Sequence, residues 1–332
     1  MMTPHEIVKP WLNAGVSPVK SEEKFAPSNI ALCKYWGKRD KLLNLPINPS
    51  LSVSLAHLGT HTCLTPIDHD EDEVWLNGLC LSEDSAFSKR VSLFLDLFRQ
   101  SKPTHFKVET RNSIPTAAGL ASSASGFAAL ALAVNDSFQL HLDAQQLSVL
   151  ARLGSGSACR SLFDGFVEWQ MGERADGLDS YATPLSETWS GLCIGLVKVD
   201  AREKATDSRS GMQRTLETAH LYQSWPIQAA MDIQAIKDAI SAHDFEGLGA
   251  KAEHNAMSMH ATMMASWPPL VYWQPESLMA MQTVWKLRAQ GLPVYFTMDA
   301  GPNLKLLFER ASADDVLAHF PDIEVIHPFG LI

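Results

Sequence analysis

Two kinds of hydrophobic pattern alternate in the first half of the chain. Residues 51–55 place apolar side chains at every second position, which predicts a half-buried strand, and another strand-like run follows at 61–65. Residues 87–98 and 126–138 repeat apolar side chains every three or four positions, which predicts helices that face a core. Further strand-like runs lie at residues 26–33, 106–108 and 166–169. The first half therefore predicts a mixed unit of helices and strands.

A new run of elements begins near residue 190. Residues 192–199 form a largely apolar strand of the kind that is buried on both faces. Helices are then expected at about 213–223, 228–242 and 244–264. We place a domain boundary at residues 188–191 and expect an α+β fold with an arm at 1–25, an N-terminal lobe at 26–190 and a C-terminal lobe at 191–332.

The last strongly patterned region ends in a carboxylate. Pro275 begins a helix that Gly291 stops, and the alternating strand 294–298 then delivers Asp299 to a glycine turn before the strand 304–308. A carboxylate at a strand end is a common place for acid or base chemistry. The alternative is an aspartate that only starts a turn.

Composition narrows the class of protein. A length of 332 residues with 46% apolar content suits one large or two medium domains, and five cysteines without a C-x-x-C pair favour a reducing, cytoplasmic setting. The first 25 residues lack the layout of a signal peptide and look like a surface arm. No apolar run predicts a membrane span, and a net charge of −10 argues against nucleic-acid binding. An anionic ligand therefore needs a local basic pocket.

Two clusters resemble metal sites but have simpler interpretations. The acidic residues of 68–73 lack the spacing of an EF-hand loop, and a solvated hairpin tip explains them better. His254 and His260 lie six positions apart, which places them poorly as helical neighbours, and methionines surround them. We expect these histidines to pack in a core.

The stretch from Asn112 to Ser125 is small, uncharged and rich in hydroxyl groups, and it runs directly into the predicted helix at 126–138. Small residues let the backbone approach a ligand, and the N-terminus of the following helix attracts an anion. The hydroxyls of Ser122, Ser123 and Ser125 would suit phosphate oxygens or magnesium. This stretch is therefore a candidate phosphate cradle, and the alternative is a helix that simply begins at a serine cap.

Two further stretches combine cations with hydroxyl or aromatic groups. Lys34 and Lys38 enclose Tyr35 and Trp36, a density that suits an anion, although an exposed loop with solvated lysines has the same composition. Residues 154–161 combine two glycines and several serines with Arg160, which suits phosphate or carboxylate. The alternative for this second stretch is a loop with one exposed arginine.

Taken together, five motifs in order resemble diphosphomevalonate decarboxylases, a branch of the galactokinase, homoserine kinase, mevalonate kinase and phosphomevalonate kinase (GHMP) superfamily. They are Asn29 to Lys38, Pro115 to Ala124, Gly154 to Arg160, Ser208 to Met212 and Met298 to Asn303. The second motif marks the superfamily. The Lys-Tyr-Trp-Gly-Lys, Gly-Ser-Gly-Ser-Ala-Cys-Arg and Asp-Ala-Gly-Pro-Asn runs point to the decarboxylase branch.

The resemblance implies a two-lobed GHMP kinase fold, with an N-terminal lobe like domain 2 of ribosomal protein S5 and a ferredoxin-like C-terminal lobe. It implies a reaction in which Mg-ATP phosphorylates the 3-hydroxyl of mevalonate 5-diphosphate. Loss of that phosphate together with the carboxyl group then yields isopentenyl diphosphate, CO2, ADP and phosphate. ATP and Mg2+ are the implied cofactors, and a homodimer is the implied assembly.

The resemblance also assigns roles to individual residues. Asp299 would face the 3-hydroxyl as a base or orienting group, with Lys34 near the transferred phosphoryl group. Asn29 and Arg160 would hold the carboxylate that leaves. The diphosphate ligands would be Tyr35, Lys38, Ser155, Ser157 and Arg209. The ATP site would comprise Pro115, Ala118, Gly119, Leu120, Ala121, Ser122, Ser123 and Ser208, with Ser122 and Ser123 also facing the metal.

Two other functions remain open on the sequence. A superfamily relative could phosphorylate without decarboxylation, or act on mevalonate or mevalonate 5-phosphate, since residue identity does not measure the length of a pocket. A binding protein without catalytic activity is the second alternative, and the joint presence of Asp299, Lys34 and the serine-rich stretch argues against it.

Overall fold

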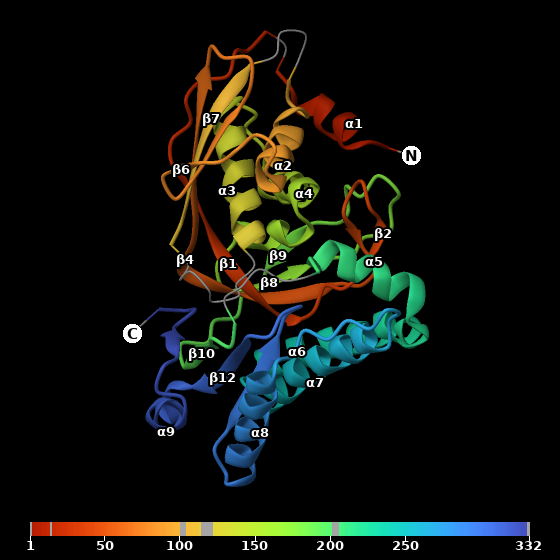
Figure 1. Ribbon diagram of the computed structural model, residues 1–332, viewed down its shortest axis with the longest axis vertical. Helices are drawn as coiled ribbons and strands as arrows, with labels where there is room; N and C mark the ends of the chain where they lie inside the picture. Colours follow the sequence, from red (N-terminus) through yellow and green to blue (C-terminus); the bar gives the residue numbers. More distant parts are fainter. Residues whose placement is uncertain (1, 14, 100–103, 114–121, 201–205, 331–332) are drawn as a thin grey trace.

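A computed structural model describes residues 2–13, 15–99, 104–113, 122–200 and 206–330. The described elements form two lobes, each built on its own sheet with helices packed against it (Figure 1). Three described helices, α2 to α4, lie on one side of the larger sheet, and α6 to α8 lie beside the smaller one. The predicted α+β class is confirmed.

The N-terminal lobe contains a seven-stranded sheet in the order β6-β5-β7-β4-β8-β9, with β1 paired to β4. Its strands are β1 (Lys24–Cys33), β4 (Ser50–Ile67), β5 (Glu73–Leu76), β6 (Leu79–Cys80), β7 (His105–Asn112), β8 (Phe166–Trp169) and β9 (Ala182–Pro184). A small separate pair comprises β2 (Lys38–Asp40) and β3 (Leu45–Pro46). The helical segments of this part are α1 (Pro4–Val8), η1 (Lys9–Trp11), α2 (Ala86–Leu95), α3 (Ser122–Ser137), α4 (Ala144–Gly154) and η2 (Gly156–Leu162).

Strand β4 corrects two predictions. The runs expected at 51–55 and 61–65 are one 18-residue strand, which pairs with β8 at its start and with β7 at its end. The expected half-burial is wrong, because both faces are covered. Leu51, Val53 and Leu55 share an apolar cluster with residues of the C-terminal lobe, whereas Ser52 faces the N-terminal lobe, where it accepts a hydrogen bond from Arg160.

The N-terminal arm is not a surface appendage. Ile7 and Val8 are buried and belong to the apolar cluster of the N-terminal lobe, together with residues of α2 and α3. Asn13 donates a hydrogen bond to the carbonyl of Gln139, which ties the arm to the end of α3. The expectation failed because a five-residue helix with two apolar side chains leaves a weak periodic signal.

The C-terminal lobe contains a four-stranded sheet in the order β11-β12-β10-β13, antiparallel at each described pairing. Its strands are β10 (Leu192–Val197), β11 (Val294–Met298), β12 (Leu304–Glu309) and β13 (Glu324–Ile326). Its helical segments are α5 (Ser208–Thr218), η3 (His220–Ser224), α6 (Trp225–Ala242), α7 (Phe245–Met264), α8 (Pro275–Ala289), η4 (Arg310–Ser312) and α9 (Ala313–His319). This chain order of strands and helices, with its strand pairing, is ferredoxin-like, as expected.

Local capping explains where several helices begin. Asp143 and Gln146 form a capping box, which satisfies backbone N–H groups at the start of α4. Helix α5 starts earlier than expected, at Ser208, because the Asp207 carboxylate accepts hydrogen bonds from the backbone N–H groups of Arg209 and Ser210. Ser208 and Arg209 therefore lie in the first turn of a helix instead of a polar loop.

The described residues bear on three expectations: an exposed acidic hairpin tip, the metal-like clusters and the membrane span. The acidic tip is exposed at residues 68–71, but the Asp72 side chain is buried and pairs with Arg99. No group of three or more potential metal-binding side chains occurs among the described residues. Within the same ranges, no helix is long and apolar enough to cross a membrane.

Candidate active site

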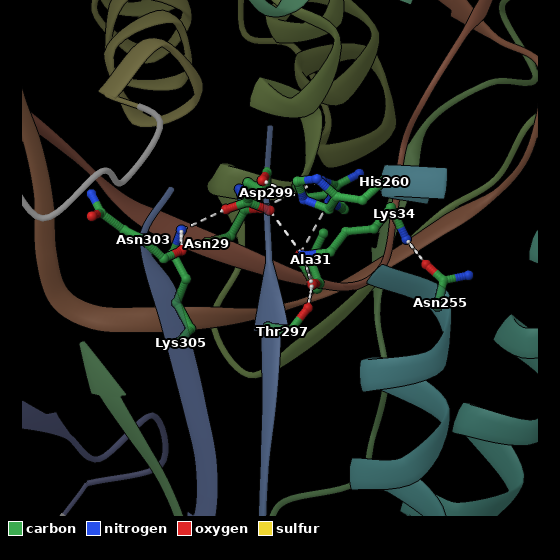
Figure 2. A network of polar contacts seen from close by, with 11 residues as sticks. Asn29, Ala31, Lys34, Asn255, His260, Thr297, Asp299, Asn303 and Lys305 are labelled. Carbon is green, nitrogen blue, oxygen red and sulfur yellow. Dashed lines mark hydrogen bonds and ion pairs between the residues drawn. The ribbon is translucent and has the colours of Figure 1, made fainter. Parts of the chain in front are cut away.

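Asp299 lies at the end of β11 between two lysine side chains (Figure 2). The Nζ atom of Lys34, at the end of β1, is 2.9 Å from Oδ1 of Asp299. The Nζ atom of Lys305, on the neighbouring strand β12, is 3.2 Å from Oδ2. Both lysine side chains are 2% exposed, whereas 28% of the Asp299 side chain remains accessible. The carboxylate can therefore meet a ligand while both of its cationic partners are shielded from water.

The two lysines set the charge of this carboxylate. Burial alone would disfavour ionisation of Asp299, but attraction to Lys305 and Lys34 outweighs burial and holds the pKa of Asp299 well below its usual range. Burial lowers the pKa of Lys34 to about 8, against the opposing attraction of Asp299. At neutral pH the Asp299 carboxylate is ionised and lies beside two lysine ammonium groups. The lysines attract an anion, and the carboxylate can accept a hydrogen bond from a hydroxyl.

Hydrogen bonds hold both the backbone and the side chain of Lys34. Its Nζ atom donates to the carbonyl of Ala31 at 2.7 Å, and its backbone N–H donates to Oδ1 of Asn255 at 2.7 Å. The Nδ2 atom of Asn255 in turn donates to the buried carboxylate of Asp232 at 2.9 Å. This chain of hydrogen bonds fixes the amide of Asn255 and ties the end of β1 to helices α6 and α7.

His260 is buried, as expected, but it also contacts the site. Its Nε2 atom is 3.1 Å from the carbonyl oxygen of Asp299. Burial lowers the pKa of His260 to about 4, although its bond to the Asp299 carbonyl acts in the opposite direction. The ring is therefore neutral at pH 7, and Nε2 carries the proton because its partner can only accept.

Arg160 is buried beside this group, so the interpretation as an exposed arginine is wrong. Its Nε atom donates to the hydroxyl of Ser52 at 3.1 Å, and its two terminal nitrogens donate to the Ser50 hydroxyl and to Oδ1 of Asn29. Asn29 donates from Nδ2 to the hydroxyl of Ser161 at 2.7 Å. The structure therefore brings Asn29 and Arg160 into direct contact, which fits a shared ligand.

The loop between β1 and β2 connects Lys34 with Lys38, and its backbone is held by the other lobe. The backbone carbonyl of Trp36 accepts hydrogen bonds from the Tyr222 hydroxyl and from Nε1 of Trp225. Gly37 has φ +117°, and a Cβ atom there would lie 1.7 Å from the Tyr222 hydroxyl, so only glycine fits this close approach. The loop is fixed, and the interpretation as a merely solvated loop is wrong for this segment.

Lys38 lines a cavity of about 690 Å³ that also includes Gly154, Arg90 and Arg209. Burial, together with repulsion from Arg209 and Arg90, lowers the pKa of Lys38 to about 8. The Nε atom of Arg90 is buried without a hydrogen-bond partner among the described residues. A buried unpaired donor and two further cations around one cavity fit a phosphate-bearing ligand.

The remaining predicted diphosphate ligands lie near this cavity or the segment that follows α4. Arg209 donates to the carbonyl of Gly154 at 3.2 Å, which joins the start of α5 to the end of α4. Ser155 is buried and ends α4, and Ser157 lies in η2. The Tyr35 ring packs on Trp169 with centroids 4.7 Å apart, and its buried hydroxyl has no partner in the described ranges. The hydrogen-bonding capacity of that hydroxyl is therefore unsatisfied within the described ranges.

Much of the predicted ATP site lies outside the described residues. This applies to Pro115, Ala118, Gly119, Leu120 and Ala121. Ser122 begins α3, Ser123 follows it and is partly buried, and Ser208 begins α5. The helix N-terminus that the cradle requires is therefore present at Ser122, earlier than the predicted start at 126.

The sequence did not single out Lys305, Asn255 or Asp232, and it gave His260 only a packing role. Lys305 has a signal that could have revealed it, because it is the single charged residue within the apolar run 304–308. Asn255 and Asp232 lie on helices whose packing decides their contacts, and no local pattern marks them.

Comparison with known families follows the same division into two parts. Residues 26–182 match the model of the diphosphomevalonate decarboxylase-like N-terminal domain, and residues 194–326 match that of the mevalonate 5-diphosphate decarboxylase C-terminal domain. The chain belongs to the diphosphomevalonate decarboxylase family. The two-lobed GHMP kinase fold implied by the sequence motifs is confirmed.

Several members of the diphosphomevalonate decarboxylase family are close relatives. The diphosphomevalonate decarboxylase of Candida albicans is 38% identical over 309 residues, which cover 88% of this chain and 85% of the relative. A solved structure of the mevalonate diphosphate decarboxylase from Enterococcus faecalis is 40% identical, with a TM-score of 0.85 and coverage of 94% and 98% of the two chains. Another solved structure, described as a complex with MVAPP, AMPPCP and magnesium, is 40% identical with a TM-score of 0.87 over the same shares.

Proposed function

We propose that this protein catalyses the ATP-dependent decarboxylation of mevalonate 5-diphosphate to isopentenyl diphosphate, CO2, ADP and phosphate, a step of the mevalonate route of isoprenoid biosynthesis. The observation that carries the proposal is the partly accessible Asp299 carboxylate, which is paired with two buried lysines in a chain of this family. The names of its relatives support the substrate and the nucleotide.

Asp299 and Lys34 are the proposed catalytic residues. A carboxylate with two cationic partners is a weak base, so its main contribution is to bind and orient the 3-hydroxyl by accepting its hydrogen bond. The ammonium of Lys34 lies beside it and stabilises negative charge that develops during phosphoryl transfer. Either role requires the ionised form of Asp299, which the surrounding charges favour.

Asn29 and Arg160 are the proposed ligands of the departing carboxylate. A guanidinium has five N–H groups, and described partners take three of those on Arg160. The remaining N–H groups lie one on each terminal nitrogen, which leaves a planar fork for a carboxylate. The contact to Asn29 places a second polar side chain at the same ligand.

The phosphate-binding roles follow the cavity and the helix N-termini. We propose Tyr35, Lys38, Ser155, Ser157 and Arg209 for the diphosphate, supported by the cluster of cations around the cavity. For ATP we propose Pro115, Ala118, Gly119, Leu120, Ala121, Ser122, Ser123 and Ser208, and for Mg2+ the hydroxyls of Ser122 and Ser123. When bound, the magnesium ion supplies positive charge to the phosphate oxygens.

The assembly and the setting are part of the same proposal. We assign residues 26–190 and 191–332 to the two lobes, a homodimer as the assembly and the cytoplasm as the location. The odd number of cysteines supports a reducing compartment. Sedimentation of the purified protein tests the dimer.

Measurement of products tests the reaction itself. With mevalonate 5-diphosphate and Mg-ATP, we expect ADP, phosphate and CO2 in equal amounts. ADP without CO2 would instead identify a kinase, and a preference for mevalonate 5-phosphate would change the substrate. No substrate-dependent ATP turnover would favour a binding protein without catalytic activity.

Asp299→Asn tests the assigned chemistry. The variant keeps the shape and an acceptor but loses the negative charge, so we expect turnover to fall by about 100-fold or more while ATP and substrate still bind. Release of ADP and of CO2 should fall together, because phosphorylation precedes loss of the carboxyl group. Asp322→Asn, at an exposed position, is the matched control. A folded Asp299→Asn variant that releases CO2 near the parent rate would return Asp299 to a turn-forming role.

A further inference from the structure

Lys305 occupies a position where an apolar side chain would be expected. It lies in β12 opposite Thr297 of β11, and leucines precede and follow it. Its side chain is 2% exposed, and its Nζ atom lies 3.2 Å from Oδ2 of Asp299 and 3.5 Å from the carbonyl oxygen of Asn303. Burial of an ammonium group costs several kcal/mol, and a well-packed apolar residue is often as stable or more stable at such a place. Fold stability alone therefore does not account for this lysine.

The geometry around Asp299 shows what Lys305 adds. Lys34 contacts only one carboxylate oxygen, and with that contact alone the carboxylate could turn about its terminal bond. Lys305 binds the other oxygen from the adjacent strand, while His260 holds the backbone carbonyl of Asp299. Three elements thus hold Asp299: the end of β1 and strand β12 through its carboxylate, and helix α7 through its backbone carbonyl (Figure 2).

We infer that Lys305 is a positioning residue for the reaction, because it fixes the orientation and the negative charge of the Asp299 carboxylate that binds the reacting hydroxyl. The inference rests on the proposed function and extends it to a residue outside the five sequence motifs. Lys305 acts through Asp299 and is not a substrate ligand. Its removal should therefore lower turnover more than it changes the KM of either substrate.

The charges around Asp299 give the direction of the pH effect. Lys34, Lys305, Arg160 and His260 face the carboxylate from four elements, and His260 is neutral at pH 7. Lys305 and Lys34 both lower the pKa of Asp299. Loss of Lys305 raises this pKa, so the acid limb of the kcat profile should move to higher pH.

The central experiment compares Lys305→Met with the parent and with Lys286→Met, which removes a lysine from an exposed position on α8. We expect Lys305→Met to lower kcat about 10- to 100-fold with both KM values within about threefold, and to move the acid limb of the kcat profile to higher pH. Lys286→Met should match the parent. A kcat within twofold of the parent, or a reduced kcat with an unmoved acid limb, would overturn the inference.

A double variant separates action through Asp299 from an independent effect. If Lys305 acts through Asp299, then Lys305→Met should lower kcat little further once Asp299→Asn is present, within about twofold. Multiplicative losses would contradict a positioning role. Lys305→Gln provides a second neutral variant that keeps a hydrogen-bond donor. It should move the acid limb in the same direction, which keeps the test decisive if the methionine variant does not fold.

Urea unfolding tests the contact between Lys305 and Asp299 independently of the assigned reaction. The parent, Lys305→Met, Asp299→Asn and the double variant form a cycle whose coupling energy reports the contact itself. If the parent releases no CO2 from mevalonate 5-diphosphate, the proposed function fails, whereas a favourable coupling would still support the Lys305–Asp299 pair. A coupling of zero would refute the pair even in an active enzyme.

Discussion

Replacement of Arg160 by lysine tests the buried guanidinium at constant charge. Arg160 donates to Ser52, Ser50 and Asn29 and is almost wholly buried, so its plane is fixed before any ligand binds. A lysine ammonium carries its donors on one nitrogen and cannot serve this polar frame and a carboxylate as a planar fork. We therefore expect Arg160→Lys to fold but to bind the substrate carboxylate poorly.

The size of the effect follows from the contacts that change. Loss of one charge-assisted hydrogen bond to the carboxylate costs about 1.5–3 kcal/mol, which corresponds to about a 10- to 150-fold decrease in kcat/KM. The hydroxyls of Ser50 and Ser52 lose a donor, but hydroxyls can rotate to other partners. We therefore expect the free energy of unfolding to fall by no more than about 3 kcal/mol.

Steady-state kinetics with mevalonate 5-diphosphate and ATP give the answer. The KM for ATP should stay near the parent value, because the guanidinium contacts are to Asn29, Ser50 and Ser52 and not to the predicted nucleotide site. Arg174→Lys is the matched control, since the Arg174 side chain is exposed and, among the described residues, pairs with its neighbour Asp176. A folded Arg160→Lys enzyme with kcat/KM within twofold of the parent would remove Arg160 from the substrate site.

Two further predictions concern the residues that support the site. Asn255→Leu should lower kcat about tenfold with little change in KM, as measured by steady-state kinetics, because the Lys34 backbone loses its acceptor and the Asp232 carboxylate loses a donor. His260 has a pKa of about 4 in the folded protein against 6.5 ordinarily, so the stability that it contributes is present above pH 6.5 and is lost as the pH falls toward 4. Between pH 7 and pH 4.5, the free energy of unfolding measured in urea should fall less for His260→Gln than for the parent. Glutamine keeps a hydrogen-bond donor but does not titrate.

Local signals predicted the elements around the site. The alternation of residues 294–298 placed Asp299 correctly at a strand end. Such signals depend on neighbours within a few positions, so the chain alone contains them. The arm was misread because only Ile7 and Val8 carry its signal.

Lys305 could have been predicted from the period of the strands. Thr297 and Asp299 lie two positions apart, so the same face of β11 continues toward the carboxylate. Lys305 pairs directly with Thr297, so its side chain emerges on that face. A strand at 304–308 after the turn was expected from the sequence, and the lysine within it was the overlooked signal.

The support of Lys34 could not be predicted in the same way. Asn255 lies 221 positions from Lys34, and the packing of α6, α7 and β1 brings them together with Asp232. No local pattern encodes which polar side chain of a long helix meets a distant strand end. Ser50 and Ser52 are similar, because the alternation of residues 51–55 placed Ser52 on one face of a strand but did not indicate that a buried arginine would donate to either hydroxyl.

In a chain whose net charge is −10, the loop at residues 34–38 connects Asp299 with the cavity that Lys38, Arg90 and Arg209 line. Lys34 points to Asp299, whereas Lys38 lines the cavity, and contacts from Tyr222 and Trp225 of the other lobe fix the backbone between them. A ligand held by both lysines must therefore carry its reacting hydroxyl and its phosphates at a set separation. On the proposed assignment, a monophosphate would lose contacts at the Lys38 end and would keep those at the Asp299 end. Because binding energy from a remote group can also support turnover, we expect the monophosphate to have a lower kcat/KM than the diphosphate, with the same role for Asp299.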